Sequence, residues 1–398
     1  MEKGKERIFP DGGANEAEHA YTCWLCSLPG VGNHTVTKLL EYFGSSENIY
    51  RAGEEELRPL LNIRQMETLS RSRQGSSPER EYQELLGQGI GFLHPGDENY
   101  PGRLREIPDA PYGLFYRGKL PEEERLAVAV IGARDCSEYG RYVAAELGRE
   151  LGKRGVSVIS GMARGIDGIS QLEALAAGGI SFGVLGCGVD ICYPKQNRQL
   201  YERLLRDGGV LSEYPPGMPP VAQNFPPRNR IVSGLADALV VVEARQKSGT
   251  LITVDMALEQ GKEVYVVPGR VTDRLSDGCN KLLKQGAGVF LSPEEFLREM
   301  EEQFVGKMTL KEVSGKRRGR GSRGKRSTGK MRKPLSELSP ELKLVYGALD
   351  MYPQSLEQIC GKISGECDQR KLSLWLMQLC VLKLAVQVSP GHFQIASL

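Results

Sequence analysis

Long apolar segments are the first feature that this sequence lacks. No apolar run reaches the roughly 18 residues that a membrane-spanning helix needs. The first 20 residues contain no apolar segment of the signal-peptide type either. We therefore expect no membrane span and a cytoplasmic location. The 398 residues exceed what one hydrophobic core usually spans, so two or three domains are expected.

Histidine and paired cysteines are also scarce. Histidine is the commonest general base of enzymes, and the chain has only four histidines: His19, His34, His94 and His392. Nine cysteines include one C-x-x-C pair, Cys23 and Cys26, with no second pair or histidine cluster at zinc spacing. Because this pair lies in an apolar run, we interpret it as two buried helix cysteines rather than metal ligands or a redox pair. No metal or other cofactor is expected.

Two common nucleotide-binding signatures are missing. The stretch "GARDCSEYG" (132–140) lacks the spacing of G-x-G-x-x-G, and "GCGVDI" (186–191) has isoleucine where the third glycine belongs. No G-x-x-x-x-G-K-[ST] loop occurs in the chain. These absences argue against a dinucleotide or P-loop site of the usual kind.

Positive charge is unevenly distributed. The net charge is +2, but residues 314–333 contain ten Lys or Arg and no acid, which leaves 42 basic against 50 acidic residues elsewhere. This Gly- and Ser-rich segment is predicted to be unstructured. It is either a solvated linker between domains or an arm that adds nonspecific affinity for nucleic acid, and both descriptions can hold together.

The N-terminal third predicts helices followed by irregular chain. We expect a disordered lead over 1–18, a helical domain over 19–75 and an irregular bridging segment over 76–125. Within the helical domain, "LPGVGNHTVTKLLEYFGS" (28–45) combines a Gly-Val-Gly turn with an amphipathic stretch. It resembles a helix-hairpin-helix of a SAM-like domain, whose turn amides can meet a DNA phosphate. A plain helix–helix connection that needs glycine for its backbone angles is the alternative.

The pattern changes after Leu126, where apolar runs alternate with helical stretches. The runs are continuously apolar, as expected of parallel strands buried on both faces. Strands are predicted at 126–132, 156–161, 180–186, 209–213, 237–244 and 263–269, with helices at 138–154, 166–178, 196–206 and 250–261. This alternation predicts an α/β domain over 126–304, built on a doubly wound parallel sheet.

The C-terminal part predicts a second, smaller domain. After the basic linker at 305–334, residues 335–398 contain three helical stretches and a hairpin that turns at Pro390-Gly391. Three helices plus a hairpin suggest a winged helix. Its third helix carries only Arg370 and Lys371 as cations, which is poor for binding in a DNA major groove. Contact with a protein, or simple packing, fits better.

Every loop that follows a predicted strand of the α/β domain supplies a glycine, a cation or both. Ligands of such sheets bind outside the carboxyl ends of the strands, where glycines allow close approach and helix N-termini attract anions. We therefore predict a rim that binds several phosphates. Its residues are Gly132, Ala133, Arg134, Ser160, Gly161, Arg164, Gly186, Lys195, Asn197, Phe225, Arg228, Asn229, Arg230, Lys247, Ser248, Gly249 and Thr250.

Each of these residues also has a purely structural interpretation. Arg134 can cap its own loop, Arg164 can pair with Asp167, and Ser248 can simply cap a helix. Arg228 and Arg230 flank one residue of a short helix, so they should point in different directions, with at least one of them structural. Tyr193 and Phe225 can stack on bases or pack beneath the loops.

An enzyme on the same sheet remains an alternative. The possible acids of the α/β domain are Glu243, Asp255 and Glu259. The placement of Glu259 after Gly249-Thr250 in a helix is similar to nucleoside-monophosphate phosphoribohydrolases. The Pro-Gly-Gly run of those enzymes is missing before Gly249.

The α/β motifs together resemble one known family. The stretches "VAVIGARDCSEYG", "VISGMARGID", "GVLGCGVDICYPKQN", "LSEYPPG", "FPPRNRIVSGL", "VVEARQKSGTLIT" and "ALEQGKEVYVVPG" occur in the order typical of the DNA-processing protein A family (DprA, also called Smf). The resemblance covers the α/β domain almost end to end. The helical N-terminal unit and the winged helix are similar to the family's commonest architecture.

This resemblance implies an extended Rossmann-like domain that binds single-stranded DNA without known catalysis. It also implies a homodimer formed through that domain and delivery of the RecA recombinase onto the bound strand, in natural transformation or related recombination. The family's DNA-contacting positions correspond to Arg134 and Lys195 and, less firmly, to the Ser160-Gly161, Gly186 and Arg228–Arg230 stretches.

The chain departs from the family pattern at two places. Ala133 stands where the family often has serine, and Ser170-Gln171 stands where it often has alanine-histidine. Three hypotheses therefore remain: a single-strand binder that loads a recombinase, a nucleotide-dependent hydrolase that needs Glu259, and a duplex-binding protein that acts through its terminal domains.

Overall fold

The computed structural model describes residues 16–75, 77–307, 338–350, 352–363, 369–389 and 391–396. Nearly all of the predicted lead (1–18) and of the basic linker (305–334) therefore lies outside the described residues, as does Pro390 of the predicted hairpin turn. Among the described residues, no helix is long and apolar enough to cross a bilayer.

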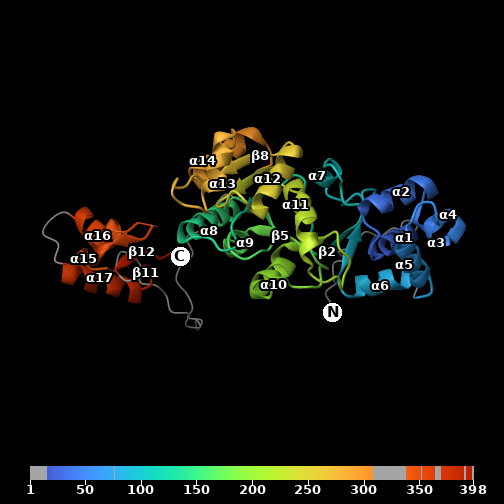
Figure 1. The fold of residues 1–398 in the computed structure, drawn as a ribbon, viewed down its shortest axis with the longest axis horizontal. Coiled ribbons are helices and arrows are strands. Elements are labelled where there is room, and N and C mark those ends of the chain that lie inside the picture. Colours follow the sequence, from blue (N-terminus) through green and yellow to red (C-terminus); the bar gives the residue numbers. More distant parts are fainter. Residues whose placement is uncertain are drawn as a thin grey trace, which may run out of the picture. The chain divides into compact units, whose positions relative to one another are not determined.

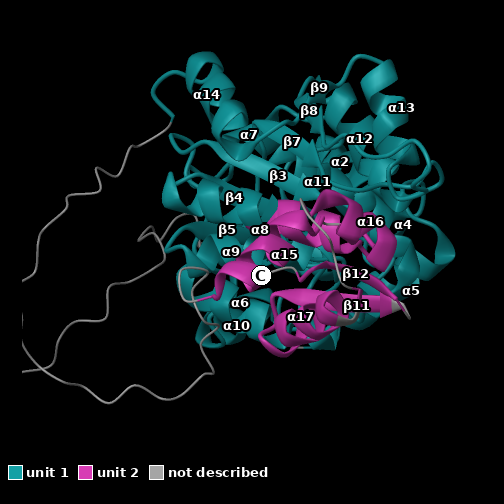
Figure 2. Cartoon of the chain, turned by 90° about the vertical axis from the view of Figure 1, so that its left-hand side faces the viewer, with its two compact units in different colours: residues 1–135, 146–310 teal, residues 136–145, 311–398 magenta. Residues whose placement is uncertain are grey.

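The chain divides into two compact units (Figure 2). The larger unit contains 1–135 and 146–310, and the smaller one contains 136–145 and 311–398. The predicted N-terminal helical domain and the predicted α/β domain thus share one compact unit. Helix α8 (Glu138–Lys153) is divided between the two units.

A nine-stranded sheet forms the centre of the larger unit (Figure 1). The strand order is β1-β2-β6-β5-β4-β3-β7-β8-β9. The strands are β1 (Gly91–Leu93), β2 (Leu114–Gly118), β3 (Ala127–Ile131), β4 (Ser157–Ser160), β5 (Ile180–Val184), β6 (Gly209–Ser212), β7 (Ala238–Val241), β8 (Glu263–Val266) and β9 (Gly288–Val289). From β6 to β9 all pairings are parallel. The predicted doubly wound sheet is confirmed, since all six predicted strands are present.

The segment 76–125 is more regular than its Pro- and Gly-rich sequence predicted. It forms α6 (Pro78–Gly87), β1, α7 (Gly102–Arg105) and β2. The strands β1 and β2 extend the sheet as an antiparallel hairpin beside β6. Both strands are short and surrounded by Pro and Gly, so the composition of this segment did not predict them. They give the sheet a mixed edge.

The chain order of the strands reverses beside β3. From β3 the chain adds β4, β5 and β6 in one direction and then returns to place β7 on the other side of β3. The remaining helices of this part are α9 (Ile166–Ala176), α10 (Arg198–Asp207), α11 (Phe225–Gly234), α12 (Gly249–Glu259), α13 (Asp277–Lys284) and α14 (Pro293–Gln303). Sheets of this type bind ligands where the strand order reverses.

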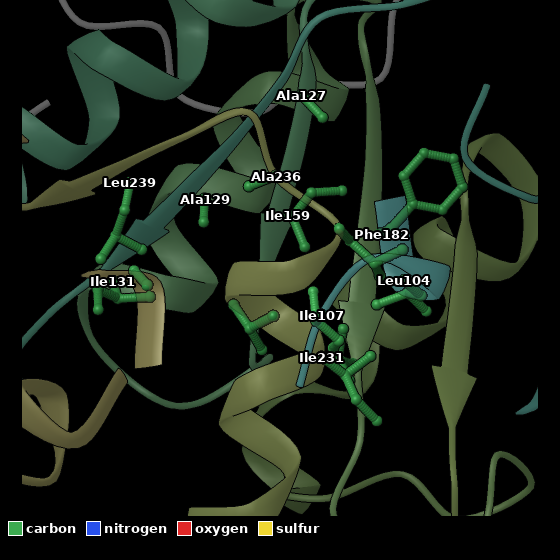
Figure 3. Close-up of a cluster of buried hydrophobic side chains, with 14 of the residues drawn as sticks. Leu104, Ile107, Ala127, Ala129, Ile131, Ile159, Phe182, Ile231, Ala236 and Leu239 are labelled. Carbon is green, nitrogen blue, oxygen red and sulfur yellow. The ribbon is translucent and has the colours of Figure 1, made fainter. Parts of the chain in front are cut away.

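Buried side chains line both faces of the sheet. On one face, residues of β3, β4 and β5 pack against α11 and the α7 segment, including Ile159, Phe182, Leu104 and Ile231 (Figure 3). On the other face, Val210 and Leu185 pack with side chains of α10 and of the α9 region. Residues Val210 and Leu211 belong to opposite faces, as the two-residue period of a strand requires. The sheet is therefore covered on both sides.

In the described part of the chain, five short helices precede α6. They are α1 (Glu16–Ser27), α2 (Asn33–Phe43), α3 (Ser46–Arg51), α4 (Glu54–Leu57) and α5 (Ile63–Arg73). The predicted Gly-Val-Gly turn joins α1 to α2, and Gly30 has a φ of 81°, which only glycine adopts readily. Asn33 fastens this turn, because its amide donates to Asp109 Oδ1 and to the carbonyl of Ala110. The prediction of two buried helix cysteines holds for Cys23, which is buried on α1, whereas Cys26 is half-buried. Burial raises the pKa of Cys23 to about 12.

The residues described after 338 in the smaller unit form three helices and a three-stranded sheet. They are α15 (Pro340–Ala348), α16 (Leu356–Lys362), α17 (Gln369–Val381), β10 (Gln354–Ser355), β11 (Ala385–Ser389) and β12 (His392–Ile395). The sheet order is β10-β12-β11. Three helices with a hairpin agree with the predicted elements. The assignment to the winged-helix class stays a prediction.

Close packing of α8 on α9 yields a test of the fold. A Cβ atom added to Gly148 would lie 2.2 Å from the carbonyl oxygen of Ser170, so the two helix backbones would have to separate. We expect Gly148→Ala to lower the free energy of unfolding by about 1–3 kcal/mol, measured by urea denaturation. Gly87→Ala is the matched control, because a Cβ there meets nothing within 4 Å. Equal stability of the two variants would contradict this packing.

Candidate nucleic-acid interface

A cleft opens at the carboxyl ends of the parallel strands, where the strand order reverses. The loops after β3, β4, β5, β6 and β7 all contribute to its walls. One part, here called the switch-point half, has a volume of about 770 Å³ and includes Ser248, Gly249 and Thr250. The other, the β5 half, has a volume of about 540 Å³ and includes Gly186 and Lys195. Both halves share Arg134, Gly161, Tyr193, Phe225 and Arg228, along with Ala163 and Pro220. The predicted convergence of five loops is confirmed.

Glycines bring the loops after β3 and β4 into contact. A Cβ on Gly132 would lie 2.7 Å from Ile166 Cγ1, and a Cβ on Gly165 would lie 2.3 Å from the carbonyl oxygen of Ala133. Gly165 also has a φ of 73°. The next residue after Ala133 is Arg134, whose exposed side chain lines both halves of the cleft.

Arg164 is exposed on the β5 half, and its partner differs from the alternative considered from the sequence. Its Nη2 lies 3.4 Å from Asp135 Oδ1, and both side chains are more than half exposed. Asp167, the partner considered from sequence, is instead buried and accepts a hydrogen bond from the Gly161 amide at 3.2 Å. An ion pair as exposed as that of Arg164 contributes little to stability.

Arg228 is a cation at the floor of the cleft. Its residue is only 5% exposed. Nη1 donates to the carbonyl of Gly161 at 2.9 Å and to the carbonyl of Val184, so the guanidinium links the ends of β4 and β5. Its Cζ lies 5.8 Å from the ring centroid of Phe225. Burial lowers the pKa of Arg228 to about 10, which still leaves it charged at neutral pH.

Asp167 faces the same floor as Arg228. Burial raises the pKa of its carboxyl, while the nearby Arg228 charge acts in the opposite direction. A buried cation and a buried carboxylate in one neighbourhood reduce each other's desolvation cost. Asp167 lies in the first turn of α9, whose N-cap residue is Gly165.

Arg230 does not line the cleft, although it was predicted at the rim. It is buried, and its Nη1 and Nη2 contact the two carboxylate oxygens of Glu213 at 2.9 and 2.6 Å. Its Nε donates to the carbonyl of Asp109 at 2.8 Å. Two residues along an α-helix turn the side chain by about 200°, so Arg228 faces the cleft while Arg230 fastens α11 to the segment before β2.

The loop after β7 ends in the helix α12, whose first turn lines the switch-point half. Ser248 caps this helix by accepting from the Thr250 amide at 3.1 Å, and the Thr250 hydroxyl donates to the carbonyl of Gly132 at 3.4 Å. Lys247 is exposed beside them. The sequence analysis missed Arg245, which is exposed and also lines this half. Arg245 could have been predicted from the sequence, because it lies in the same loop two residues before Lys247.

The β5 half combines a cation with aromatic rings. Lys195 is exposed here, at the start of a short 3-10 helix. Tyr193 is 41% exposed, and its ring centroid lies 5.4 Å from that of Phe225. Gly186 makes room for Phe225, because a Cβ there would lie 2.9 Å from its ring. The two rings therefore form part of the cleft wall and do not lie wholly beneath the loops.

Three further predicted residues have different placements. The hydroxyl of Ser160 is buried and donates to the carbonyl of Val130 at 2.7 Å. The Asn197 amide donates to the carbonyls of Met162 and Ala163, both at 2.9 Å. These two residues hold the loops in place. Asn229 is half-buried and lines the switch-point half.

None of the three acids considered for hydrolysis is among the residues that line the cleft. Glu259 is the last residue of α12, whose first turn lines the cleft, and an 11-residue helix spans about 16 Å. Asp255 and Glu243 are not among the lining residues, whose carboxylates are Asp135 and Asp167. Gln171, at the family's histidine position, is buried and donates to the carbonyl of Phe182 at 2.9 Å. That position faces the core.

The Arg230–Glu213 pair supports a stability prediction. Replacing Arg230 by alanine leaves a mostly buried carboxylate without its bidentate partner, which costs about 3–5 kcal/mol of the free energy of unfolding. Arg134→Ala, at an exposed cleft position, should change it by less than about 0.5 kcal/mol. Urea denaturation of both variants measures the difference. A stable Arg230→Ala protein would show that this side chain does not anchor α11.

Comparisons with known proteins agree with this architecture. A family model described as DNA recombination-mediator protein A matches residues 91–301. Protein Smf of Synechocystis is 32% identical over 94% of this chain and 98% of its own length. DNA processing protein DprA of Streptococcus pneumoniae is 42% identical over 52% of this chain and 72% of its own length. The X-ray structure of DprA from the same species covers 71% of this chain and 97% of its own, with 34% identity and a TM-score of 0.60. The chain therefore belongs to the DNA recombination-mediator protein A family, which includes the DprA and Smf proteins.

Proposed function

We propose that the cleft binds single-stranded DNA and that the protein mediates homologous recombination. The observation that carries this proposal is the convergence of exposed cations around an aromatic pair. Arg134, Lys195 and Lys247 come from the loops after three different strands and line one continuous cleft. Cations spaced along a groove follow a phosphate backbone.

The aromatic pair favours a single strand over a duplex. Tyr193 and Phe225 lie in the wall shared by both halves. Unpaired bases can stack on such rings, whereas the bases of a duplex are already stacked and paired. The cation of Arg228 beneath Phe225 strengthens this surface, because a guanidinium near a ring face is itself attracted to it. The site requires no base-specific hydrogen bonds, so it suits binding with little sequence preference.

Family membership supports the remaining steps of the proposed function. A recombination mediator holds a single strand and transfers it to a recombinase, here RecA, in natural transformation or related recombination. The location would be cytoplasmic, where such strands and RecA meet. Assembly of RecA on single-stranded DNA can be followed through its ATP hydrolysis with and without this protein. No acceleration would remove this part of the proposal.

We propose a homodimer that forms through the larger unit. Helix α12 exposes Leu258, which is 57% exposed and lies outside the cleft lining, whereas the exposed Ile252 lines the switch-point half. We assign Leu258 to the contact, because a partner would cover this large apolar side chain. Because the first turn of α12 lines the cleft, a dimer through this helix would place two clefts in one assembly.

The cleft is tested by fluorescence anisotropy of labelled oligo-dT at several salt concentrations. We expect Arg134→Ala with Lys195→Ala to weaken binding by at least about tenfold and to reduce the salt slope by about 2, since each lost phosphate contact removes about 1. Arg80→Ala with Lys153→Ala removes two exposed cations from other helices and should leave binding nearly unchanged.

A chain that ends at Lys307 separates the cleft from the basic segment and the smaller unit. If the truncated chain keeps its affinity, the cleft is the single-strand site. If it fails to bind while the double variant binds normally, the residues after Lys307 carry the DNA. That result would refute the proposed site and favour the duplex-binding hypothesis.

Leu258→Glu tests the dimer. It places a charge on an exposed apolar position, so the fold should tolerate it while the interface does not. We expect the molar mass from light scattering to fall from that of a dimer to that of the 43.8 kDa chain. The control is Glu263→Lys, which changes the charge of an exposed residue on β8. Lys262, which follows α12, is partly buried and therefore less suitable. A wild-type monomer would refute the dimer.

A further inference from the structure

The switch-point half contains more positive charge than a passing DNA chain requires. Its lining includes four cationic side chains, Arg134, Arg228, Arg245 and Lys247, against the two carboxylates of Asp135 and Asp167. The excess is two positive charges within about 770 Å³. An internal phosphodiester carries one negative charge, whereas a phosphate monoester carries about −1.5 to −2 near neutral pH. The charge balance therefore fits a monoester.

The floor of this half offers an unused donor. Arg228 is 5% exposed, and its Nε has no hydrogen-bond partner within the described residues. Its Nη1 is already engaged by the carbonyls of Gly161 and Val184. A buried guanidinium N–H without an acceptor costs free energy. This N–H is itself almost inaccessible, so an anion in the cleft interacts with the charge of the guanidinium, which lines this half, rather than with the N–H directly.

The first turn of α12 provides a second, independent attraction for an anion. This helix has 11 residues, and its Ser248, Gly249 and Thr250 line the same half as Arg228. Helix N-termini carry a partial positive charge and unpaired amides that favour phosphate. Among the described residues, the Ser248 hydroxyl accepts a hydrogen bond from one backbone amide of this turn, that of Thr250. The helix end and the buried arginine therefore act on the same space.

We propose that the switch-point half binds a phosphate monoester, either the phosphorylated end of a DNA strand or a free mononucleotide. This inference rests on the proposed function only where the ligand is the phosphorylated end of a DNA strand. The β5 half, with Lys195 and the aromatic pair, holds the internal part of the strand. The strand then ends against Arg228, Arg245, Lys247 and the start of α12. Asp167 on the floor offsets part of the Arg228 charge, so the exposed cations are needed as well.

The test compares oligonucleotides that differ only at one end. Full-length protein is titrated with labelled dT15 that carries a 5′-hydroxyl, a 5′-phosphate or a 3′-phosphate, and with 5′-hydroxyl dT16, which adds one internal phosphodiester. We expect one of the two terminal phosphates to tighten binding about tenfold, the effect of one or two charge-assisted hydrogen bonds. The dT16 strand should gain less than twofold. Thymidine 5′-monophosphate, titrated by calorimetry, tests the free nucleotide.

Two sets of variants locate the effect. Arg245→Ala with Lys247→Ala should reduce the ratio between the phosphate and hydroxyl affinities to about 1. Lys195→Ala, which changes only the β5 half, should weaken both strands by the same factor and preserve the ratio. Circular dichroism melts confirm that each variant folds. A ratio that falls equally in both sets would contradict a separate subsite.

The outcomes distinguish this inference from the proposed function. If hydroxyl-ended dT15 binds tightly while no terminal phosphate adds affinity and thymidine monophosphate does not bind, the inference is overturned and the proposed function stands. Suppose that thymidine monophosphate binds, that the Arg245→Ala with Lys247→Ala variant loses this binding, and that no terminal phosphate changes the affinity of a strand. The ligand is then a free nucleotide. If no strand binds but the nucleotide does, the proposed function fails and the subsite remains.

Discussion

The buried guanidinium of Arg228 is the contact on which the cleft depends. It joins the carbonyls at the ends of β4 and β5, lies beneath Phe225 and faces the carboxyl of Asp167. Burying an arginine is costly unless its charge and donors are engaged. Here two backbone carbonyls and a nearby carboxylate meet most of that cost. The same guanidinium links the two strand ends, so the cation at the floor also shapes the cleft.

Glycines around Arg228 leave the space that its guanidinium and Phe225 occupy. A side chain on Gly161 would lie 2.8 Å from the Arg228 guanidinium, and one on Gly186 would lie 2.9 Å from Phe225. These positions must be empty for the arginine and the ring to occupy their places. The exposed cations Arg134, Lys195 and Lys247 stand on the loops that surround this packing.

The sequence predicted the sheet and the convergence of its loops because both follow from strong local patterns. Continuous apolar runs between helices specify parallel strands, and parallel strands bring their following loops to one edge. It could not decide between Arg228 and Arg230, since their directions depend on where α11 begins. The carboxylate that engages Arg230, Glu213, comes from a loop 17 residues away. The β1–β2 hairpin was missed for a similar reason: short strands in Pro- and Gly-rich chain are specified by their partner β6 rather than by their own sequence.

The cleft lining combines cations, an aromatic pair and two carboxylates. Its lining residues in both halves include no histidine, and each of its two carboxylates is engaged, Asp135 with Arg164 and Asp167 with the Gly161 amide. A general base needs a free acceptor close to the proton that it removes. Glu259 is at the far end of α12, and Gln171 fills the core where the family often has histidine. What remains at the strand ends is positive charge beside an aromatic surface, a combination that suits the single strand proposed as the ligand.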